Sequence, residues 1–178
     1  MIRTESALRL ALQAHATQTR KTDGSPYVIH PIMVAHLLTE HSAREDVIVA
    51  ALLHDVLEDT SVTPAEVLAV GGEEVLKIVE AVSENKELSW EERKEAYVHT
   101  VVQGGESVWL VSIADKIHNA ESLLDHITSV GEEAWSVFNR GKESKIWFET
   151  LLHTELSKVW QHPLLDRYGA LINTLQKS

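Results

Sequence analysis

The segment ALLHDVLEDT, residues 51–60, places four ionisable side chains inside a stretch that otherwise reads as buried helix. They belong to His54, Asp55, Glu58 and Asp59, and alanine, leucine and valine surround them. On a continuous helix, Glu58 lies one turn beyond His54, and Asp59 one turn beyond Asp55. An unpaired carboxylate is costly to bury, and several polar groups buried together are costlier still. We therefore expect a bound cation at His54 and Asp55 to stabilise these groups, with Glu58 and Asp59 one turn away from it.

The spacing of apolar residues is helical along nearly the whole chain, and no segment alternates in the manner of a strand. Proline, glycine and capping residues mark most helix ends; SWEE at 89–92, for example, is a capping box. The sequence therefore predicts an all-α fold, a bundle of roughly eight helices. The expected helices cover residues 4–17, Pro31 onward, 46–59, Pro64 to Gly71, 73–84, 90–103, 107–127, 132–161 and Pro163 onward.

Composition indicates a single globular domain over residues 1–178. Hydrophobic residues make up 44% of the chain and charged residues 24%, as is usual for soluble proteins. No apolar run reaches the roughly 18 residues that a membrane span needs, so no membrane partner is expected. The absence of cysteine excludes disulfides and thiolate metal sites, and it agrees with a cytoplasmic location.

The net charge of the chain limits the kinds of ligand that it is expected to bind. With 16 basic and 27 acidic residues the net charge is −11, which argues against nucleic acid as a partner. A phosphate-bearing ligand would need local attraction, from a metal ion or a few basic residues. A turn-rich loop before His30 carries two basic residues, Arg20 and Lys21. The guanidinium of Arg20 could stack on a purine or bind phosphate. A solvent-exposed turn explains both residues equally well. Weaker candidates are Lys86, Arg93 and Lys94.

A second expected helix also carries polar residues on one face. Asp115, Asn119 and Ser122 follow one another at helical spacing within an apolar segment, and His30 stands at the start of another helix. Together with the His-Asp pair of residues 51–60, these groups offer nitrogen and oxygen ligands. Such a mixed set suits Mn²⁺, Fe²⁺, Zn²⁺ or Mg²⁺.

Each of these groups taken alone also has a structural explanation. A buried His-Asp pair is more often a satisfied hydrogen bond than a metal site, and Asp115 could instead pair with Lys116 or Lys145. The remaining histidines are expected to be structural or solvated, with His118 the most open case. What favours a functional interpretation is that the polar motifs occur together and in order.

Four segments together resemble a known family. RKTDGSPYVIHP, ALLHDVLEDT, VSENKELSWEERK and ADKIHNAESL are similar, in order and spacing, to the HD-domain guanosine tetraphosphate hydrolases. That family includes the hydrolase half of the Rel/SpoT enzymes and the small stand-alone alarmone hydrolases. The similarity covers roughly residues 4–160, and because no synthetase region follows, the chain resembles the stand-alone type.

The resemblance implies a role for each matching residue. The implied ligands of Mn²⁺, with other divalent cations allowed, are His30, His54, Asp55 and Asp115. The carboxylates implied to handle the attacking water are Glu58 and Asp59. The residues expected to bind the nucleotide are Arg20, Lys21, Asn119, Ser122, Arg140 and Lys142.

One segment departs from the family pattern. Metazoan relatives carry a Trp/Arg/Tyr pattern after the Asp115 helix, whereas residues 134–152 read AWSVFNRGKESKIWFETLL. Trp135 and Arg140 could correspond to the first two positions, but no tyrosine stands at the third. Which residues of this segment contact phosphate therefore has to be determined from the structure.

The expected activity is removal of the 3′-pyrophosphate of guanosine tetra- or pentaphosphate, giving GDP or GTP and pyrophosphate. Two alternatives remain: an HD phosphohydrolase of another nucleotide, such as the 2′- or 3′-phosphate of a dinucleotide like NADPH, or a nucleotide sensor without turnover. Intact Glu58 and Asp59 argue against a sensor, since binding alone does not need them. The expected partner is the small-molecule nucleotide, and the sequence also allows a homodimer.

Overall fold

The computed structural model describes residues 2–178. Within this range the chain is all-α, and an isolated bridge between Thr19 and Pro26 is the only β-type pairing. The predicted fold class is thereby confirmed. The elements are α1 (Arg3–Ala14), α2 (Ile29–Glu40), α3 (Glu45–Leu53), α4 (Val56–Asp59), α5 (Pro64–Gly71), α6 (Glu73–Val82), α7 (Trp90–Gln103), α8 (Glu106–Val130), the 3₁₀-helix η1 (Gly131–Val137), α9 (Gly141–Ser157) and α10 (Pro163–Lys177).

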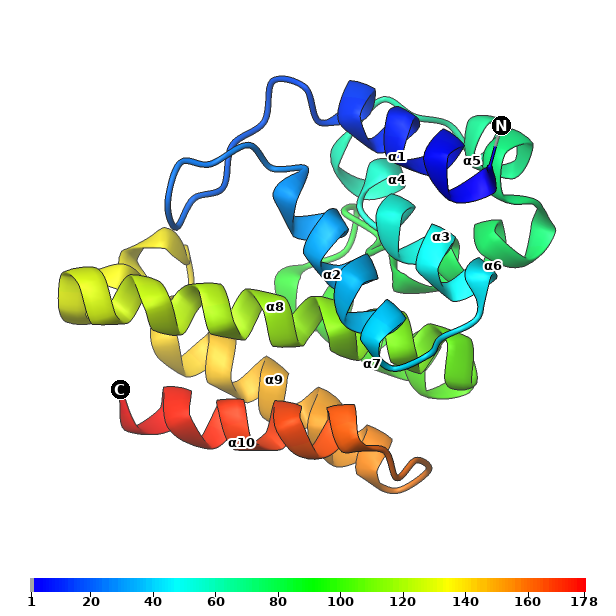
Figure 1. The fold of residues 1–178 in the computed structure, drawn as a ribbon. Helices are drawn as coiled ribbons and strands as arrows, with labels where there is room; N and C mark the ends of the chain where they lie inside the picture. The colour runs from blue at the N-terminus through cyan, green and yellow to red at the C-terminus, as the bar shows by residue number, and fades with distance from the viewer. Residues whose placement is uncertain (1) are drawn as a thin grey trace.

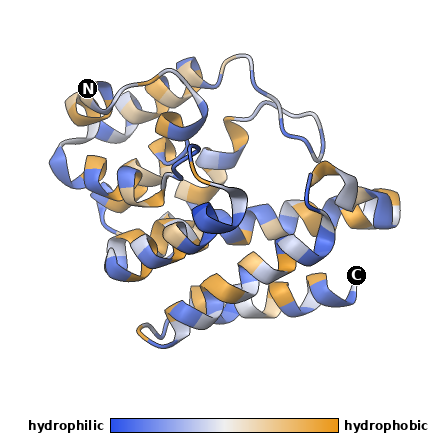
Figure 2. Ribbon diagram, turned by 180° about the vertical axis from the view of Figure 1, so that it is seen from behind, coloured by the Kyte–Doolittle hydropathy of each residue, from blue (hydrophilic) through white to orange (hydrophobic). Residues whose placement is uncertain are grey.

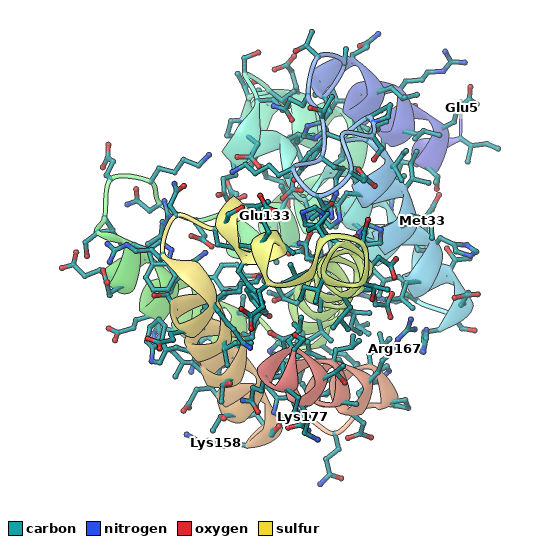
Figure 3. All side chains as sticks on the ribbon, turned by 90° about the vertical axis from the view of Figure 1, so that its left-hand side faces the viewer. Glu5, Met33, Glu133, Lys158, Arg167 and Lys177 are labelled. Atoms are coloured by element: carbon teal, nitrogen blue, oxygen red, sulfur yellow. The ribbon has the colours of Figure 1, made fainter. Side chains whose placement is uncertain are left out.

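Helix α8 runs through the middle of the molecule, and the chain ends lie on opposite sides of it (Figure 1). Helices α2 and α3 pack against α8 from one side and α10 from the other, while α9 packs on α10. Viewed nearly along α8, side chains of the neighbouring helices enclose it (Figure 3). Ile113 and Ile117 of α8 and Leu53 of α3 are fully buried in the core that results.

The predicted helix over residues 46–59 is wrong, because the chain breaks at the His-Asp pair. Helix α3 ends at Leu53 and the short helix α4 starts at Val56. The imidazole Nδ1 of His54 lies 2.7 Å from the carbonyl oxygen of Ala51, which a continuous helix would offer to the N–H of Asp55. The break leaves His54 and Asp55 in the junction, so Glu58 does not follow His54 along one helix axis.

The predicted helix over residues 132–161 is also wrong. Helix α8 ends at Val130, η1 begins at Gly131 (φ 71°), and α9 begins at Gly141 (φ 72°). Both glycines adopt the left-handed conformation that other residues avoid, and they bracket the turn back from α8. The sequence between them therefore forms a compact corner beside α8.

The other predicted boundaries agree with the structure within a few residues. The capping box between Ser89 and Glu92 forms at the start of α7, and Pro163 opens α10. The long loop between α1 and α2 is mostly hydrophilic to intermediate in character (Figure 2). Across the described residues, no helix combines the length and apolar character that crossing a bilayer requires.

Candidate metal centre and adjoining cavity

Three side chains from distant parts of the chain meet at one buried point. His30 comes from the first turn of α2, His54 from the junction directly after α3, and Asp115 from the middle of α8. The Nε2 atom of His30 lies 3.0 Å from Asp115 Oδ1 and 3.2 Å from His54 Nε2. One ligand atom from each residue lies within 4.8 Å of the others, so the three could hold one ion.

Asp55 stands at the edge of the same point. Its Oδ2 atom lies 3.1 Å from His54 Nε2 and 3.6 Å from His30 Nε2. The same oxygen accepts a hydrogen bond from the hydroxyl of Tyr27 at 2.6 Å. The structure therefore brings together all four residues that the resemblance implies as metal ligands.

The hydrogen bonds around the imidazoles fit a metal site. Because a carbonyl only accepts, His54 Nδ1 must donate to Ala51, and in the neutral ring the Nε2 lone pair then faces the cluster. His30 Nδ1 lies 2.7 Å from His118 Nδ1, so His30 can donate there and keep its own Nε2 lone pair free. Two Nε2 atoms that face each other and a carboxylate suit a cation, which would take the place of the proton that the carboxylates favour on His54 Nε2. Outer hydrogen bonds of this kind orient metal-binding histidines.

The charges in the cluster are strongly coupled. Burial disfavours the charged forms throughout, but the carboxylates of Asp55 and Asp115 outweigh it at His54 and raise its pKa well above the usual value. At Asp115, Lys116 and the two imidazoles likewise outweigh burial and hold the pKa well below its usual range. Burial, with His30 and Arg20 nearby, lowers the pKa of His118 to about 4. His118 is therefore neutral at pH 7 and can accept the bond from His30.

The two other acidic residues of the opening segment lie beside this centre. Burial raises the pKa of Glu58, whose Oε2 accepts the backbone N–H of Glu84 at 3.1 Å. Asp59 is more exposed, and its Oδ1 lies 2.8 Å from the ammonium of Lys86. Lys86 also donates to the carbonyl of Glu58 at 2.7 Å, so one lysine ties both acidic residues to the α6–α7 loop.

A cavity of about 330 Å³, here called the loop cavity, opens beside Asp59. Arg20 lies in its wall and donates from both terminal nitrogens to Asn119 Oδ1 at 3.1 Å. Asn119 donates in turn to Asp115 Oδ1 at 2.5 Å, which links the cavity wall to the candidate metal centre. The lining residues are Thr19, Arg20, Lys21, Thr22, Tyr27, Asp59, Asn119, Leu123, Val137, Phe138 and Lys145.

The remaining predicted nucleotide contacts are more scattered. Ser122 does not line the loop cavity but a neighbouring polar hollow, which shares Thr22 with it. Arg140 lies in a second cavity and pairs with Glu91 at 2.8 Å. Lys142 lines neither cavity, and its ammonium lies 5.3 Å from the centre of the Trp135 ring.

The sequence did not single out several residues that the structure brings to the site. Tyr27 and Lys145 line the loop cavity, and His118 contacts His30. Lys86 was a weak candidate for binding phosphate, but it contacts the two acidic residues instead. The only local signals were the position of His118 three residues after Asp115, and that of Tyr27 three residues before His30.

In this all-α bundle, imidazoles and carboxylates from distant parts of the chain meet at one point. These features place the protein in the class of helical proteins with a buried cation site. A family model described as HD domain matches residues 7–140. The chain therefore belongs to the HD-domain family, as the sequence motifs predicted.

Curated relatives share this region. The guanosine-3′,5′-bis(diphosphate) 3′-pyrophosphohydrolase MESH1 of Homo sapiens is 40% identical over 120 residues, which are 66% of this chain and 67% of the human protein. A guanosine-3′,5′-bis(diphosphate) 3′-pyrophosphohydrolase of Aquifex aeolicus is 36% identical over 150 residues, 83% of this chain but 20% of that protein.

Solved structures match the fold. The crystal structure of lmo0812 from Listeria monocytogenes has a TM-score of 0.78 and 35% identity, and the match covers 84% of this chain and 99% of that one. A metazoan ortholog of SpoT has a TM-score of 0.81 over 98% of this chain and 96% of its own. At 24% identity, the second match supports the fold alone.

Proposed function

We propose that this protein is a metal-dependent phosphohydrolase that removes the 3′-pyrophosphate of guanosine tetra- or pentaphosphate. The products are pyrophosphate and GDP or GTP. The observation that carries the proposal is the convergence of His30, His54 and Asp115, with Asp55 at their edge, next to a cavity of nucleotide size. The names of the relatives from Homo sapiens and Aquifex aeolicus support the choice of substrate.

The residues that would hold the cation are His30, His54, Asp55 and Asp115. Their mixed nitrogen and oxygen donors suit Mn²⁺, which we propose as the ion used. When bound, the ion supplies Lewis acidity that offsets the charge developing on the attacked phosphate. Asp55 is held for this task by the hydroxyl of Tyr27, and His30 by the ring of His118.

Glu58 and Asp59 are proposed to manage the protons of the reaction. Burial raises the pKa of Glu58 and makes its carboxylate a stronger base than an exposed glutamate. Glu58 would accept the proton of the attacking water. Asp59 lines the loop cavity, where it can orient that water or return a proton to the leaving oxygen.

Arg20 and Asn119 are proposed to hold the nucleoside. Their hydrogen bonds fix the guanidinium plane at the cavity wall, where a planar group can stack on a purine. Lys21 adds a positive charge to the same wall, suited to a phosphate. Ser122 and Lys142 stay predictions, since both lie outside the loop cavity.

Pyrophosphate release from guanosine tetraphosphate tests the proposal, measured after chelation and again with added Mn²⁺. We expect release only with the metal, and its loss in Asp115→Asn. Asp125→Asn, on the exposed side of the same helix, is the matched control and should keep activity. Phosphate release from NADPH without cleavage of the guanosine compound would favour the dinucleotide alternative, and binding without turnover would favour a sensor.

We also propose that residues 1–178 form one phosphohydrolase domain, because α8 packs against both early and late helices. The cytoplasmic location and the homodimer that the sequence allows stay predictions.

A further inference from the structure

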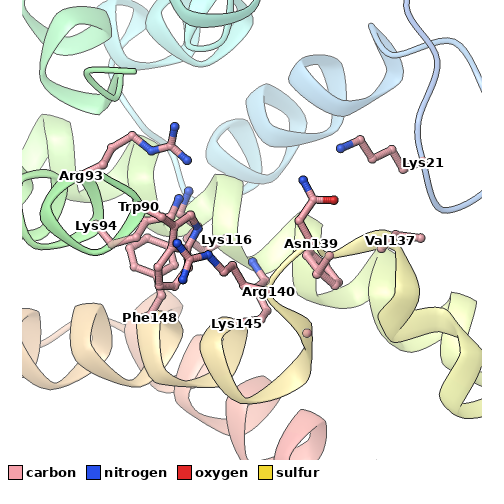
Figure 4. Close-up of a pocket in the computed structure, with 12 residues that line it drawn as sticks. Lys21, Trp90, Arg93, Lys94, Lys116, Val137, Asn139, Arg140, Lys145 and Phe148 are labelled. Carbon is pink, nitrogen blue, oxygen red and sulfur yellow. The ribbon is translucent and has the colours of Figure 1, made fainter. Parts of the chain in front are cut away.

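A second cavity of about 430 Å³ adjoins the loop cavity. The two share Lys21, Val137, Phe138 and Lys145 in their walls, so they are direct neighbours. The second cavity lies between α7, the middle of α8, and the corner that leads into α9 (Figure 4). It contains none of the candidate metal ligands and neither Glu58 nor Asp59.

The lining of this second cavity, here called the cationic cavity, is strongly basic. Six of its twelve lining residues are lysine or arginine, and none is acidic. This concentration is unexpected in a chain whose net charge is −11. The six are Lys21, Arg93, Lys94, Lys116, Arg140 and Lys145.

The carboxylates that partner these cations are too few to neutralise them. Glu84 serves both Arg93 and Lys94, and the fully buried Glu149 holds Lys145. The other two partners are Asp115, for Lys116, and Glu91, for Arg140. Six cations thus face four carboxylates, an excess of two positive charges, and Asp115 is also a candidate metal ligand.

Aromatic rings position several of the cations without neutralising them. The ammonium of Lys94 lies 4.5 Å from the centre of the Phe148 ring, and the guanidinium of Arg140 lies 5.6 Å from that of Trp90. Burial and the nearby ammonium of Lys116 lower the pKa of Lys94. Gathering these charges therefore costs free energy in the empty protein, and an anion in the cavity would offset that cost.

We propose that the cationic cavity binds the 5′-phosphate chain of the substrate, so that affinity rises with the number of 5′-phosphates. This inference rests on the proposed function for the identity of the nucleotide. With the base and ribose in the loop cavity and the 3′-pyrophosphate at the metal centre, the 5′ chain leaves past Lys21 and Lys145. Lys94 and Arg140, which line only the cationic cavity, receive the distal phosphates. Pentaphosphate is then the preferred substrate over tetraphosphate.

Calorimetry on the metal-loaded protein tests this with guanosine, GMP, GDP and GTP, which carry no 3′-phosphate. We expect affinity to rise along the series, with GTP bound roughly tenfold or more tighter than GMP, because charge-assisted contacts are added. Equal affinities along the series would overturn the proposal. Equal affinities would mean that the cationic cavity binds the 3′-pyrophosphate or a separate anion.

Two variants test whether an increase in affinity from GMP to GTP comes from the cationic cavity or from the metal. Lys94→Met keeps the length of the side chain, and Glu84 keeps Arg93 as its partner at 2.7 Å. Arg140→Met removes a half-exposed side chain with little effect on folding. Each should lower the GTP-to-GMP affinity ratio about tenfold. Lys77→Met, which removes an exposed lysine of α6, is the control and should leave the ratio unchanged.

If the ratio stays the same in both cavity variants, the 5′-phosphates bind elsewhere and the proposal is overturned. The binding series does not depend on hydrolysis. A failure of pyrophosphate release would count against the proposed function, whereas the affinity ratios judge the cationic cavity by themselves.

Discussion

The Nδ1 atoms of His30 and His118 lie 2.7 Å apart, so the ring of His118 fixes the orientation of a candidate metal ligand. Removing such an outer partner typically weakens metal binding about 10–100-fold. We expect that loss in His118→Ala, measured as Mn²⁺ affinity by calorimetry, with partial recovery in His118→Asn, whose amide oxygen can accept. His99→Ala, on the exposed side of α7, should bind Mn²⁺ like the wild type. An unchanged affinity in His118→Ala would show that the contact does not orient His30.

Glu58→Gln should abolish most turnover without releasing the metal. The amide keeps the shape of the side chain but cannot accept a proton, and general base catalysis contributes about 10²–10⁴-fold. Parallel measurements of kcat and of bound metal test this. Glu74→Gln, an exposed residue of α6, serves as the control. Wild-type turnover in Glu58→Gln would remove Glu58 from the mechanism.

The pH dependence of the reaction should reflect the raised pKa of Glu58. Burial raises this pKa above the usual value of 4.5, and the carboxylates of Glu84, Asp59 and Asp55 add to it. Because the charged form is the base, activity is present above the pKa and is lost as the pH falls through it. Glu84→Gln should shift this acid limb of kcat/KM to lower pH, since it removes a negative charge and leaves the cations nearby. An acid limb at the same pH in both proteins would contradict this assignment.

Lys86 should matter for catalysis more than for stability. Its ammonium holds Asp59 at 2.8 Å, but its side chain is 51% exposed. Exposed ion pairs contribute about 0–1 kcal/mol to the free energy of unfolding, so Lys86→Met should unfold nearly like the wild type. Loss of the contact lets Asp59 move, and small displacements of positioned groups cost up to about 10²-fold in rate. Lys86→Arg, which can still reach Asp59, should keep more of kcat than Lys86→Met.

Packing next to the metal centre should account for much of the stability. Leu53 is fully buried and directly precedes His54. Leu53→Ala should lower the free energy of unfolding by about 2–5 kcal/mol, because it leaves a cavity in the core. Leu68 is 42% exposed, and Leu68→Ala should change that free energy by less than about 1 kcal/mol. Urea denaturation of both variants tests the difference.

The helices were largely predictable because their signals are local. Apolar spacing, the capping box at Ser89, and Pro163 each act within a few residues, and the structure has helices where they indicate them. The break at His54 was not predictable in this way. It depends on the imidazole taking the carbonyl of Ala51 while its other nitrogen faces α2 and α8.

The candidate site, like the fold, was predictable only where the signal is local in the sequence. The sequence marked the residues whose chemistry suits a cation, because buried carboxylates and imidazoles in apolar helices need a partner. It did not indicate that His118 would contact His30, or that Lys86 would contact Asp59. These pairs are 88 and 27 residues apart in the chain.

The sequence by itself determined that the chain is helical, that it belongs to the HD-domain family, and which side chains could bind a metal. Only the tertiary structure decided how those side chains meet. It also decided that basic residues scattered over a strongly acidic chain line a single cavity. The physical reason is that periodicity and capping are properties of neighbouring residues, whereas convergence depends on how α2, α7, α8 and α9 pack against one another.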